Sequence, residues 1–524
     1  MDPTWFFLKI AEYFIPNLTS LKKIRTALIS VYYKDRLDEI VTLLEANNVK
    51  IYSTGGTYDF IRSLGVNAET VESLTGYPSI LGGRVKTLHP KVLGGILGQQ
   101  SKPSDIEQMT AYNIPAIDLV IVDLYPFEET AAKTNNPSEI IEKIDIGGIS
   151  LIRAGAKNYE DVLIVPSSVY YAELIEVLTN QDGGSDLADR RRFATYAFGI
   201  SSYYDSVIYQ WMSGNNPEQL RIMAKDKSVL RYGENPHQQG IFHGNLDQIF
   251  DKIHGKELSY NNLLDLEAGI NLIDEFDECT FAILKHNNAC GIASRATVKD
   301  AYEAALAGDP VSAFGGVLVC NRIIDEAAAE IINSLFFEIV IAPGFEINAL
   351  KIIQSRKNRI ILQRRGFETQ KKQFKSILNG ILEQEKDFRT ESVVDFNYVT
   401  TVRPAEDQLS DLIFANKIVK HTRSNAIVLA KNKQLSGSGV GQTSRVDALK
   451  QAIAKAKEFG FDLCGAVMAS DAFFPFADSV EIAANAGITS VVQPGGSVRD
   501  QDTIDYCNNH GIGMVFTGIR HFKH

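Results

Sequence analysis

The sequence predicts an α/β protein whose first domain contains a parallel sheet and whose second domain is large enough for two lobes. Thr26–Val31 and Val49–Tyr52 are short apolar runs typical of strands, and the apolar residues between Leu37 and Leu44 recur at helical spacing. A strand, a helix and a strand within about 30 residues form a βαβ unit, which implies a parallel sheet. The 524 residues also exceed what one hydrophobic core holds.

The first domain continues through two more buried strands and a long helix, which we expect at Asp118–Leu124, Asp161–Val165 and Asp189–Trp211. Ser213–Pro217 (SGNNP) is the clearest linker signal in the chain. We therefore divide the chain into an N-terminal extension (1–23), a first domain (24–212), a linker (213–228) and a second domain (229–524).

The second domain repeats the alternation of strand and helix, which predicts a second α/β unit. A helical pattern covers Ala448–Phe459, and no clean repeat between two lobes is visible. Strand-like runs occur at Thr280–Leu284, Gly316–Cys320, Ile339–Ala342, Arg359–Leu362, Asn425–Ala430, Gly465–Met468 and Thr489–Gln493.

Composition excludes several classes of protein. The net charge of −11 argues against a general nucleic-acid binder, which needs a basic surface. The five cysteines form no Cys-x-x-Cys pair, so we expect neither disulfides nor a Cys-rich metal site, and a reducing cytoplasm fits best. No apolar run is long enough to span a membrane. The apolar stretch near Trp5 lacks preceding Lys or Arg, so we interpret it as an extension, not a signal peptide.

Four loops of the first domain carry residues suited to a phosphorylated ligand. Ser53–Thr57 (STGGT) links a strand to a helix, where backbone N–H groups favour an anion; a tight capped turn is the alternative. Gly82–Pro90 (GGRVKTLHP) gathers several donors, against the alternative of a solvated basic turn. Asp123–Phe127 ends the central strand, where open α/β sheets bind ligands, although an ordinary strand exit gives the same pattern.

The fourth loop, Asp145–Ser150, leads into a predicted helix that starts near Gly148. Ser150, Arg153 and Lys157 then share one helix face, which is also the pattern of an ordinary solvated cation stripe. Together the four loops supply phosphate donors, lysines and carboxylates, the groups needed for acid–base work on a phosphorylated substrate.

The second domain has four further candidate segments. Arg231–Gln238 (RYGENPHQ) combines an arginine, an aromatic ring and a histidine. Lys285–Asn288 (KHNN) follows a strand directly, which suits proton transfer and oxyanion stabilisation, although an isolated Lys-His pair is often incidental. Gly437–Arg445 offers either a phosphate-facing arginine at a helix start or a flexible hairpin, and it fits no P-loop. Asp471–Phe476 (DAFFPF) provides rings that either stack a pterin or belong to the core.

These segments, in this order, resemble the family of bifunctional AICAR transformylase/IMP cyclohydrolase enzymes over roughly Lys23–His524. GGRVKTLHP, IDIGG with its downstream AKN, RYGENPHQ, KHNNACG, SNAIVLAKN, GQTSR, SDAFFPF and GIRHFKH carry the resemblance. It implies a methylglyoxal-synthase-like parallel-sheet domain followed by a larger domain of two cytidine-deaminase-like lobes without zinc.

The resemblance also implies the residues of two sites. In the first site, it places catalytic roles on Lys86, Tyr125, Asp145 and Lys157, and nucleotide contacts on Lys34, Thr54, Gly55, Gly56, Thr57, Arg84, Val85, Thr87, Asp123 and Ile146. In the second site, it makes Lys285 and His286 the catalytic pair and implies AICAR contacts at Arg231, Tyr232, Gly315, Glu338, Asn425 and Arg445. It implies folate contacts at Val446, Phe473, Ser497, Val498 and Arg520.

One loop departs from the family pattern. Many members have Ser-Asp-Lys where this chain has Tyr32-Tyr33-Lys34, so we expect contacts from the first two positions through their backbone N–H groups. The resemblance further implies 10-formyltetrahydrofolate as co-substrate, no zinc, and a cytoplasmic homodimer with formyltransferase sites at the interface.

Three other functions are alternatives for parts of this sequence. A zinc-dependent deaminase needs a Pro-Cys-x-x-Cys zinc site, which is missing from this sequence. A non-catalytic phosphate-binding regulator would not need both Lys86 and Lys157 together with a complete second half. Methylglyoxal synthase accounts for the first domain alone.

Overall fold

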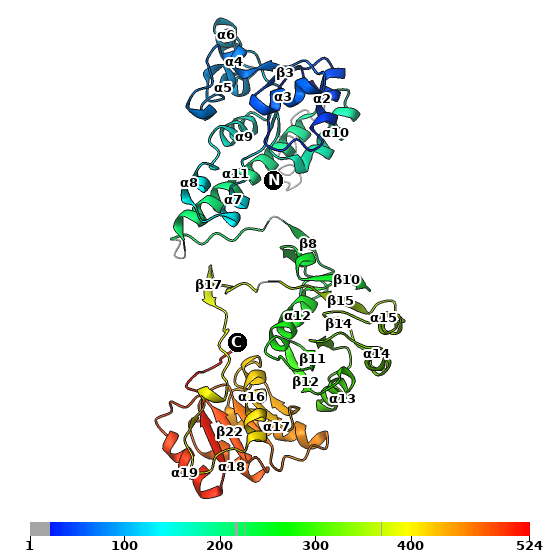
Figure 1. The fold of residues 1–524 in the computed structure, drawn as a ribbon, viewed down its shortest axis with the longest axis vertical. Helices are drawn as coiled ribbons and strands as arrows, with labels where there is room; N and C mark the ends of the chain where they lie inside the picture. The colour runs from blue at the N-terminus through cyan, green and yellow to red at the C-terminus, as the bar shows by residue number, and fades with distance from the viewer. Residues whose placement is uncertain (1–20, 215–217, 225, 368) are drawn as a thin grey trace, which may run out of the picture. The chain divides into compact units, whose positions relative to one another are not determined.

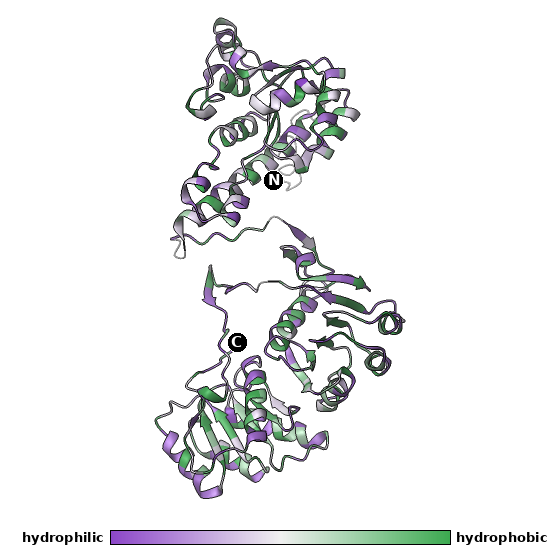
Figure 2. Cartoon of the chain, in the orientation of Figure 1, coloured by the Kyte–Doolittle hydropathy of each residue, from purple (hydrophilic) through white to green (hydrophobic). Residues whose placement is uncertain are grey.

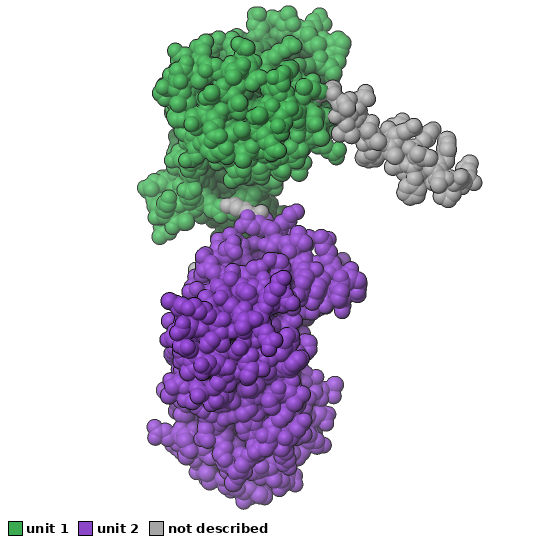
Figure 3. Space-filling view, turned by 90° about the vertical axis from the view of Figure 1, so that its right-hand side faces the viewer, with its two compact units in different colours: residues 1–223 green, residues 224–524 purple. Residues whose placement is uncertain are grey.

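The computed structural model describes residues 21–214, 218–224, 226–367 and 369–524. The chain divides into two compact units, Met1–Met223 and Ala224–His524 (Figure 1, Figure 3). The division falls within 213–228, the range expected to be a linker. Residues 1–20 of the expected N-terminal extension lie outside the described residues.

Unit 1 is built on a five-stranded sheet in the order β4-β3-β2-β5-β6, in which all neighbouring strands are parallel. Its strands are β2 (Thr26–Ser30), β3 (Lys50–Ser53), β4 (Glu69–Thr70), β5 (Leu119–Val122) and β6 (Leu163–Val165), with a separate pair β1 (Lys22–Lys23) and β7 (Gly184–Ser185). Its helices are α2 (Leu37–Ala46), α3 (Gly55–Ser63), α4 (Val71–Thr75), α5 (Pro90–Leu97), α6 (Pro103–Ala111), α7 (Phe127–Lys133), α8 (Pro137–Ile141), α9 (Gly147–Lys157), α10 (Tyr171–Asn180) and α11 (Leu187–Ser213).

The parallel sheet of unit 1 is buried on both faces because alternate residues of each strand enter different cores. Ala27 and Ile29 of β2 pack in one cluster with α2 and α10, whereas Leu28 packs in a second cluster with α5 and α9. The strands are consequently apolar throughout, which is why the sequence pattern reveals them.

Unit 2 contains two six-stranded mixed sheets. We call residues 250–364 the first lobe and residues 397–516 the second lobe. The first-lobe sheet has the order β10-β15-β14-β13-β11-β12 and the second-lobe sheet β18-β23-β22-β21-β19-β20. A shared core spans both lobes, with Leu284 of β11 and Val428 of β19 in one cluster. Hydrophobic residues follow the central strands of these sheets, and hydrophilic residues lie on the outer helix faces (Figure 2).

The elements of unit 2 are as follows. The first lobe has β10 (Phe250–His254), α12 (Tyr260–Ile273), β11 (Thr280–Lys285), β12 (Asn288–Ser294), α13 (Val298–Gly308), β13 (Val317–Cys320), α14 (Glu326–Ile332), β14 (Ile339–Ala342), α15 (Ile347–Ile353) and β15 (Ile360–Arg364). The second lobe has β18 (Asn397–Tyr398), α16 (Glu406–Lys420), β19 (Ile427–Ala430), β20 (Leu435–Gly439), α17 (Arg445–Glu458), β21 (Val467–Ser470), α18 (Asp478–Asn485), β22 (Ser490–Gln493), α19 (Asp500–His510) and β23 (Gly513–Phe516). Two hairpins stand outside the sheets: β8 (Lys227–Val229) with β9 (Ile241–His243), and β16 (Lys372–Ile377) with β17 (Gly380–Glu385).

The two lobes repeat one topology, although no repeat was visible in the sequence. In each lobe a hairpin (β11–β12 or β19–β20) lies at one edge, three parallel strands follow, and an antiparallel strand closes the other edge. The hairpin turns match as well. Asp265 of α12 accepts a hydrogen bond from the N–H of Asn287, and Asp411 of α16 accepts bonds from the N–H groups of Asn432 and Lys433.

The glycines at 437 and 439 serve packing between a strand and a helix. A Cβ on Gly439 would lie 1.8 Å from the carbonyl oxygen of Ala448 in α17, and one on Gly437 would lie 2.3 Å from that of Ala452. Gly291 of β12 is pressed against Ala305 of α13 in the same way. The segment is therefore an ordered strand up to Gly439, which corrects the alternative of a flexible hairpin.

No helix in the described part of the chain is both long and apolar enough to cross a membrane.

Replacing Gly439 by Ala should destabilise unit 2 by roughly 1–3 kcal/mol or more, because the added methyl group forces β20 away from α17. The free energy of unfolding of the full chain by urea measures this. Gly366→Ala is the matched control, since a Cβ there meets no atom within 4 Å, and it should stay within about 0.5 kcal/mol of the parent. Equal unfolding midpoints for both variants would contradict the close packing.

Candidate functional site

The first candidate site lies at the carboxyl edge of the unit 1 sheet, where parallel sheets commonly bind ligands. Val31–Lys34 follows β2, Thr54–Thr57 follows β3, and Asp123–Tyr125 follows β5. The start of α9 at Gly147 adds Asp145 and Ile146. The structure thus brings together four loops that are far apart in the sequence.

The loop after β3 leaves backbone donors open. Thr54 precedes α3 without capping it through its side chain, so the first N–H groups of the helix are available to an anion. The Thr54 hydroxyl instead lies 2.8 Å from that of Ser30, and buried Thr57 bonds to the backbone of Val31. Lys86 reaches this loop, because its Nζ lies 3.5 Å from the position of a Cβ on Gly55.

Some side chains of the loop Gly82–Pro90 face the first site, and others make contacts outside it. Lys86 and Thr87 face the site, since the Thr87 hydroxyl lies 2.9 Å from the position of a Cβ on Gly147. Arg84 instead pairs with Glu142 at 2.9 Å, with both side chains exposed. His89 caps α5 by accepting the N–H of Lys91 at 3.2 Å. The carbonyl of Val85 accepts the N–H of Leu88 within the same loop.

Two buried carboxylates dominate the charge of the first site. Asp145 accepts the N–H of Gly148 at 2.6 Å, and Asp123 accepts the N–H groups of Tyr32 and Tyr33. Burial raises the pKa of both carboxyls, against the lowering effect of these hydrogen bonds. Burial, together with the charge of Asp145, also raises the pKa of the Tyr125 hydroxyl. Both carboxyls and the Tyr125 hydroxyl therefore hold a proton more firmly than the same groups do in water.

The Tyr32-Tyr33-Lys34 loop differs from its expected role. Because the backbone N–H groups of Tyr32 and Tyr33 bond to Asp123, they are already occupied and are not free for a ligand. The Tyr32 ring lies edge-on to Tyr125, with ring centres 5.9 Å apart. Lys34 donates to the carbonyl of Tyr32 at 2.9 Å, and burial lowers its pKa.

Lys157 is separated from the other predicted catalytic residues of the first site. It is the last residue of α9, whereas Asp145 lies just before the helix begins. Eleven helical residues span about 15 Å, so the exposed Lys157 lies towards the opposite edge of the sheet. Within one chain, Lys86 is the lysine that lies beside Asp145, and its charge acts on the pKa of that carboxyl.

The second candidate site is centred on the turn between β11 and β12. His286 and Asn287 adopt left-handed backbone conformations, with φ of 51° and 67°. The Asp265 carboxylate stabilises this turn by accepting the Asn287 N–H at 2.6 Å, and burial raises its pKa. The turn leaves His286 exposed to solvent.

Lys285 is fixed by two carbonyl oxygens. Its Nζ donates to Phe314 at 2.9 Å and to Gly315 at 3.2 Å. Gly315 has φ of +68°, and a Cβ there would lie 3.2 Å from the lysine Nζ. Glycine at 315 therefore allows both the backbone conformation and the approach of the ammonium group.

Glu338 and Arg231 lie on the same side of the first lobe. Glu338 accepts from Lys256 at 3.2 Å and from Asn262 at 3.0 Å. Burial works against its ionisation, but these bonds and the charge of Arg231 lower its pKa. Arg231 donates to the Tyr232 hydroxyl at 2.9 Å. The charged form of Glu338 suits it to accept hydrogen bonds from a polar ligand.

The turn between β11 and β12 is also hydrogen-bonded to the second lobe. Asn288 accepts the N–H of Arg423 at 3.1 Å, two residues before Asn425. Arg445, the first residue of α17, pairs with buried Asp471 at 3.3 Å, and its Nε is buried without a partner. The structure therefore links His286, Asn425 and Arg445 through adjoining segments, and it leaves a donor on Arg445 for a ligand.

The predicted folate residues are less closely grouped. Arg520 lies 4.4 Å from the Phe522 ring, and Arg445 lies 5.7 Å from the same ring, so these two arginines are neighbours. Phe473 is half-exposed whereas Phe474 is fully buried, so the aromatic run is split between surface and core. Val446 follows Arg445 in α17. Ser497 and exposed Val498 lie just before α19, where the N–H of Ser497 donates to Asp500.

Sequence reasoning missed the carboxylates that hold these loops. Asp265, Asp411 and Asp471 come from elements distant in sequence from the turns they hold or the arginine they pair with. One signal was present: Asp265 precedes Lys285 by twenty residues, and Asp411 precedes Lys431 by the same interval. Among the described residues, no cluster of three His, Cys, Asp or Glu side chains is placed to hold a metal ion.

Comparison with known proteins gives the family. Residues 155–455 match the family described as AICARFT/IMPCHase bienzyme, and residues 36–150 match the MGS-like domain. Similar curated proteins, each called bifunctional purine biosynthesis protein PurH, occur in Bacteroides thetaiotaomicron (60% identical over 97% of this chain and 100% of the relative), Acetivibrio thermocellus (46%, 96% and 100%) and Aquifex aeolicus (45%, 95% and 100%).

The chain belongs to the AICARFT/IMPCHase bienzyme family. The predictions of this family, of its α/β fold with an MGS-like parallel-sheet domain, and of a bifunctional formyltransferase and cyclohydrolase are thereby confirmed.

Replacing Asp145 by Asn should raise the thermal stability of unit 1 at pH 7. Burial raises the pKa of this carboxyl, so its charge costs free energy in the folded state, whereas an amide oxygen still accepts the Gly148 N–H. The folded pKa lies above the unfolded value of about 3.9. The gain should therefore be full at neutral pH and vanish below about pH 4, where Asp145 is protonated in both states.

The matched control is Asp189→Asn, measured by the same melting experiment. Burial opposes ionisation of Asp189, but hydrogen bonds from Gln181 and Arg192 outweigh it and lower the pKa. This substitution should therefore lower the melting temperature at pH 7. A lower melting temperature for Asp145→Asn as well would show that the charge on Asp145 does not destabilise the folded state.

Proposed function

We propose that the chain performs the last two steps of IMP synthesis at two separate sites. The second site would transfer a formyl group from 10-formyltetrahydrofolate to the amine of AICAR, and the first site would close the formylated product to IMP with loss of water. The observation that carries this proposal is that each site has its own lysine whose charge acts on a carboxyl with a burial-raised pKa, Lys86 on Asp145 and Lys285 on Asp265. Family membership supports placing the enzyme in the cytoplasm.

In formyl transfer, the amine of AICAR is a weak nucleophile because its lone pair is delocalised into the ring and the carboxamide. It must lose a proton as it attacks the formyl carbon. His286, exposed on its tight turn, is the proposed proton acceptor, directly or through the carboxamide. Lys285, oriented by the carbonyls of Phe314 and Gly315, would stabilise the tetrahedral oxyanion and help to protonate the departing folate nitrogen.

The remaining contacts of the second site follow the family positions. Arg231, Tyr232, Gly315, Glu338, Asn425 and Arg445 would contact AICAR, and Val446, Phe473, Ser497, Val498 and Arg520 would contact the folate. The unpartnered Nε of buried Arg445 supports an anionic ligand at that point.

In cyclisation, the carboxamide nitrogen attacks the formyl group of the same molecule, and water leaves. Holding the two groups together supplies much of the rate, because the reaction is intramolecular. Asp145, Lys86 and Tyr125 would orient the amide and stabilise the intermediate, while the open N–H groups at the start of α3 would bind the phosphate.

Lys157 remains the proposed proton acceptor of cyclisation, but its distance from Asp145 requires that it act from a second copy of the chain. We propose a homodimer for this reason and for another. The β16–β17 hairpin exposes Phe374, Ile377, Ile381 and Leu382. A two-stranded ribbon alone is marginally stable in water, which favours its burial against a partner.

Replacing His286 by Ala or Lys285 by Met should slow formyl transfer by about 10²–10⁴-fold, because each removes a group that acts in the transition state. Nucleotide binding and IMP formation from the formylated nucleotide should stay near parent values. Initial-rate spectroscopy with 10-formyltetrahydrofolate measures the first reaction, and the second is followed without folate.

Lys431→Met is the matched control, since Lys431 occupies the corresponding turn of the second lobe and donates to the carbonyl of Cys464. Its rate of formyl transfer should stay within about twofold of the parent. Near-normal turnover by His286→Ala, or an equal loss of rate in Lys431→Met, would contradict the roles proposed for His286 and Lys285 in formyl transfer.

Mixing subunits tests whether Lys157 acts from a partner. Lys86→Met and Lys157→Met homodimers should each fail to cyclise the formylated nucleotide. After subunit exchange, random pairing should restore about a quarter of the parent activity, because half of the dimers are mixed and each mixed dimer has one intact site. No recovery would exclude action from the partner, and full activity of Lys157→Met alone would exclude a catalytic role.

A further inference from the structure

The last residues of the chain, 517–524, form a segment that we call the C-terminal arm. Its backbone is held on both sides: the N–H of His521 donates to the carbonyl of Asp471 at 3.0 Å, and Ser424 exchanges two hydrogen bonds with Lys523 at 2.9 and 3.0 Å. The Lys523 ammonium donates to the carbonyl of His421 at 3.2 Å. The arm therefore follows a defined path beside Asp471, the partner of Arg445.

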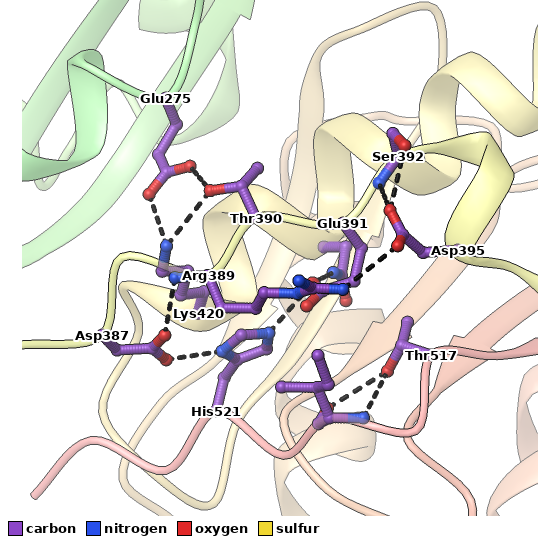
Figure 4. A network of polar contacts seen from close by, with 12 residues as sticks. Glu275, Asp387, Arg389, Thr390, Glu391, Ser392, Asp395, Lys420, Thr517 and His521 are labelled. Carbon is purple, nitrogen blue, oxygen red and sulfur yellow. Dashed lines mark hydrogen bonds and ion pairs between the residues drawn. The ribbon is translucent and has the colours of Figure 1, made fainter.

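The His521 ring is buried between two carboxylates (Figure 4). Its Nδ1 lies 2.6 Å from Asp387 and its Nε2 lies 3.0 Å from Glu391, and only 2% of the side chain is exposed. A neutral imidazole carries hydrogen on one nitrogen only, so the second contact would set two lone pairs against each other. Two carboxylate partners thus require the imidazolium form, in which both nitrogens donate.

The carboxylates that hold His521 are themselves fixed. Glu391 accepts from the Asn416 amide at 2.8 Å, and Asp387 accepts the N–H of Arg389 at 3.1 Å. Both belong to the segment 386–395, which reaches the first lobe through Thr390, whose hydroxyl donates to Glu275 at 2.5 Å (Figure 4). The ring of His521 therefore connects the arm to a segment that is anchored on the first lobe.

Glu275 is a second ionic centre of the same network. It accepts from Lys420 at 2.7 Å and from His421 at 2.9 Å. Burial would raise its pKa, but these hydrogen bonds and that of Thr390 lower it to about 2. Glu275 is therefore charged at any physiological pH, and the anchor of segment 386–395 does not change when His521 titrates.

The residues on either side of His521 face the second site. Arg520 is exposed and lies 4.4 Å from the Phe522 ring, which is 42% exposed and lies 5.7 Å from Arg445. Burying the ring of His521 thus sets its two neighbours on the outer side of the arm, next to Arg445.

We propose that His521, held as an imidazolium by Asp387 and Glu391, is a positioning residue that keeps Arg520 and Phe522 beside Arg445 for binding of the folate co-substrate. The inference rests on the proposed function, in which Arg445 contacts the nucleotide and Arg520 the folate. His521 itself touches neither substrate.

The charged groups around the ring define the pH dependence. Asp387 and Glu391 of segment 386–395 face it directly, Lys420 and His421 of the α16 end interact with Glu275, and Lys523 lies on the arm itself. Burial would lower the pKa of His521, but the two carboxylates raise it to about 9. This value exceeds the unfolded value of about 6.5. The stabilisation by the two ion pairs of His521 is therefore complete below about pH 6.5 and is lost as the pH rises through 9.

His521→Ala in the full-length chain should raise the KM for 10-formyltetrahydrofolate by about 10- to 100-fold, the effect expected from losing hydrogen bonds between charged groups. It should change kcat by less than it changes KM, and cyclisation in unit 1 should be unaffected. In the parent enzyme the folate KM should rise above about pH 9, and in Asp387→Asn the rise should begin at lower pH. His510→Ala, which removes an exposed histidine of α19, should match the parent.

Each outcome decides the proposal. An unchanged folate KM in His521→Ala, or equal effects on kcat and KM, would overturn the positioning role. If His521→Ala does not fold, Asp387→Asn decides instead, and a pH profile identical to that of the parent would overturn it. Arg520→Ala distinguishes the proposed folate site from the positioning role of His521. If that variant has a normal folate KM, the proposed placement of the folate is wrong, whatever His521 does.

Discussion

The candidate sites of this protein depend on buried and half-buried carboxylates that accept hydrogen bonds from the backbone N–H groups of tight loops. Asp123 fixes the loop after β2, Asp145 the start of α9, Asp265 the turn after β11, and Asp411 the corresponding turn of the second lobe. Burial raises the pKa of all four carboxyls. An unmatched buried N–H or carboxylate is costly, so each loop has one well-defined conformation in which these groups satisfy each other.

The two lobes of unit 2 share one topology but present different side chains at the corresponding turn. In both lobes a lysine ends or directly follows the first strand of the edge hairpin (Lys285 in β11, Lys431 after β19), an aspartate holds the turn, and a glycine is pressed against the next helix. In the first lobe the turn presents His286, whereas in the second lobe Asn432 occupies that position and Lys431 binds the carbonyl of Cys464. In the proposed formyltransferase site the second lobe would instead provide Asn425, Arg445 and the C-terminal arm, so that the two lobes would complement each other.

The sequence allowed the central strands and the ligand loops to be predicted, because parallel strands buried on both faces are continuous apolar runs that end where ligands bind. It did not allow the antiparallel edge strands to be predicted. β20 contains Gly437 and Gly439 and has no apolar run, since its packing against α17 requires the absence of side chains. Nor did it place Lys157 relative to Asp145, because residues on one helix face can still lie about 15 Å apart along the helix axis. The partners Asp265 and Asp387 were missed because long-range pairing leaves no local pattern.

The central claim is that two separate sites in one chain act in succession on one phosphorylated ring. The most direct measurement supplies the purified protein with AICAR and 10-formyltetrahydrofolate and follows all products by chromatography and absorbance. The account predicts that tetrahydrofolate and IMP form in equal amounts. Unchanged AICAR would contradict the account, and so would accumulation of the formylated nucleotide without conversion to IMP.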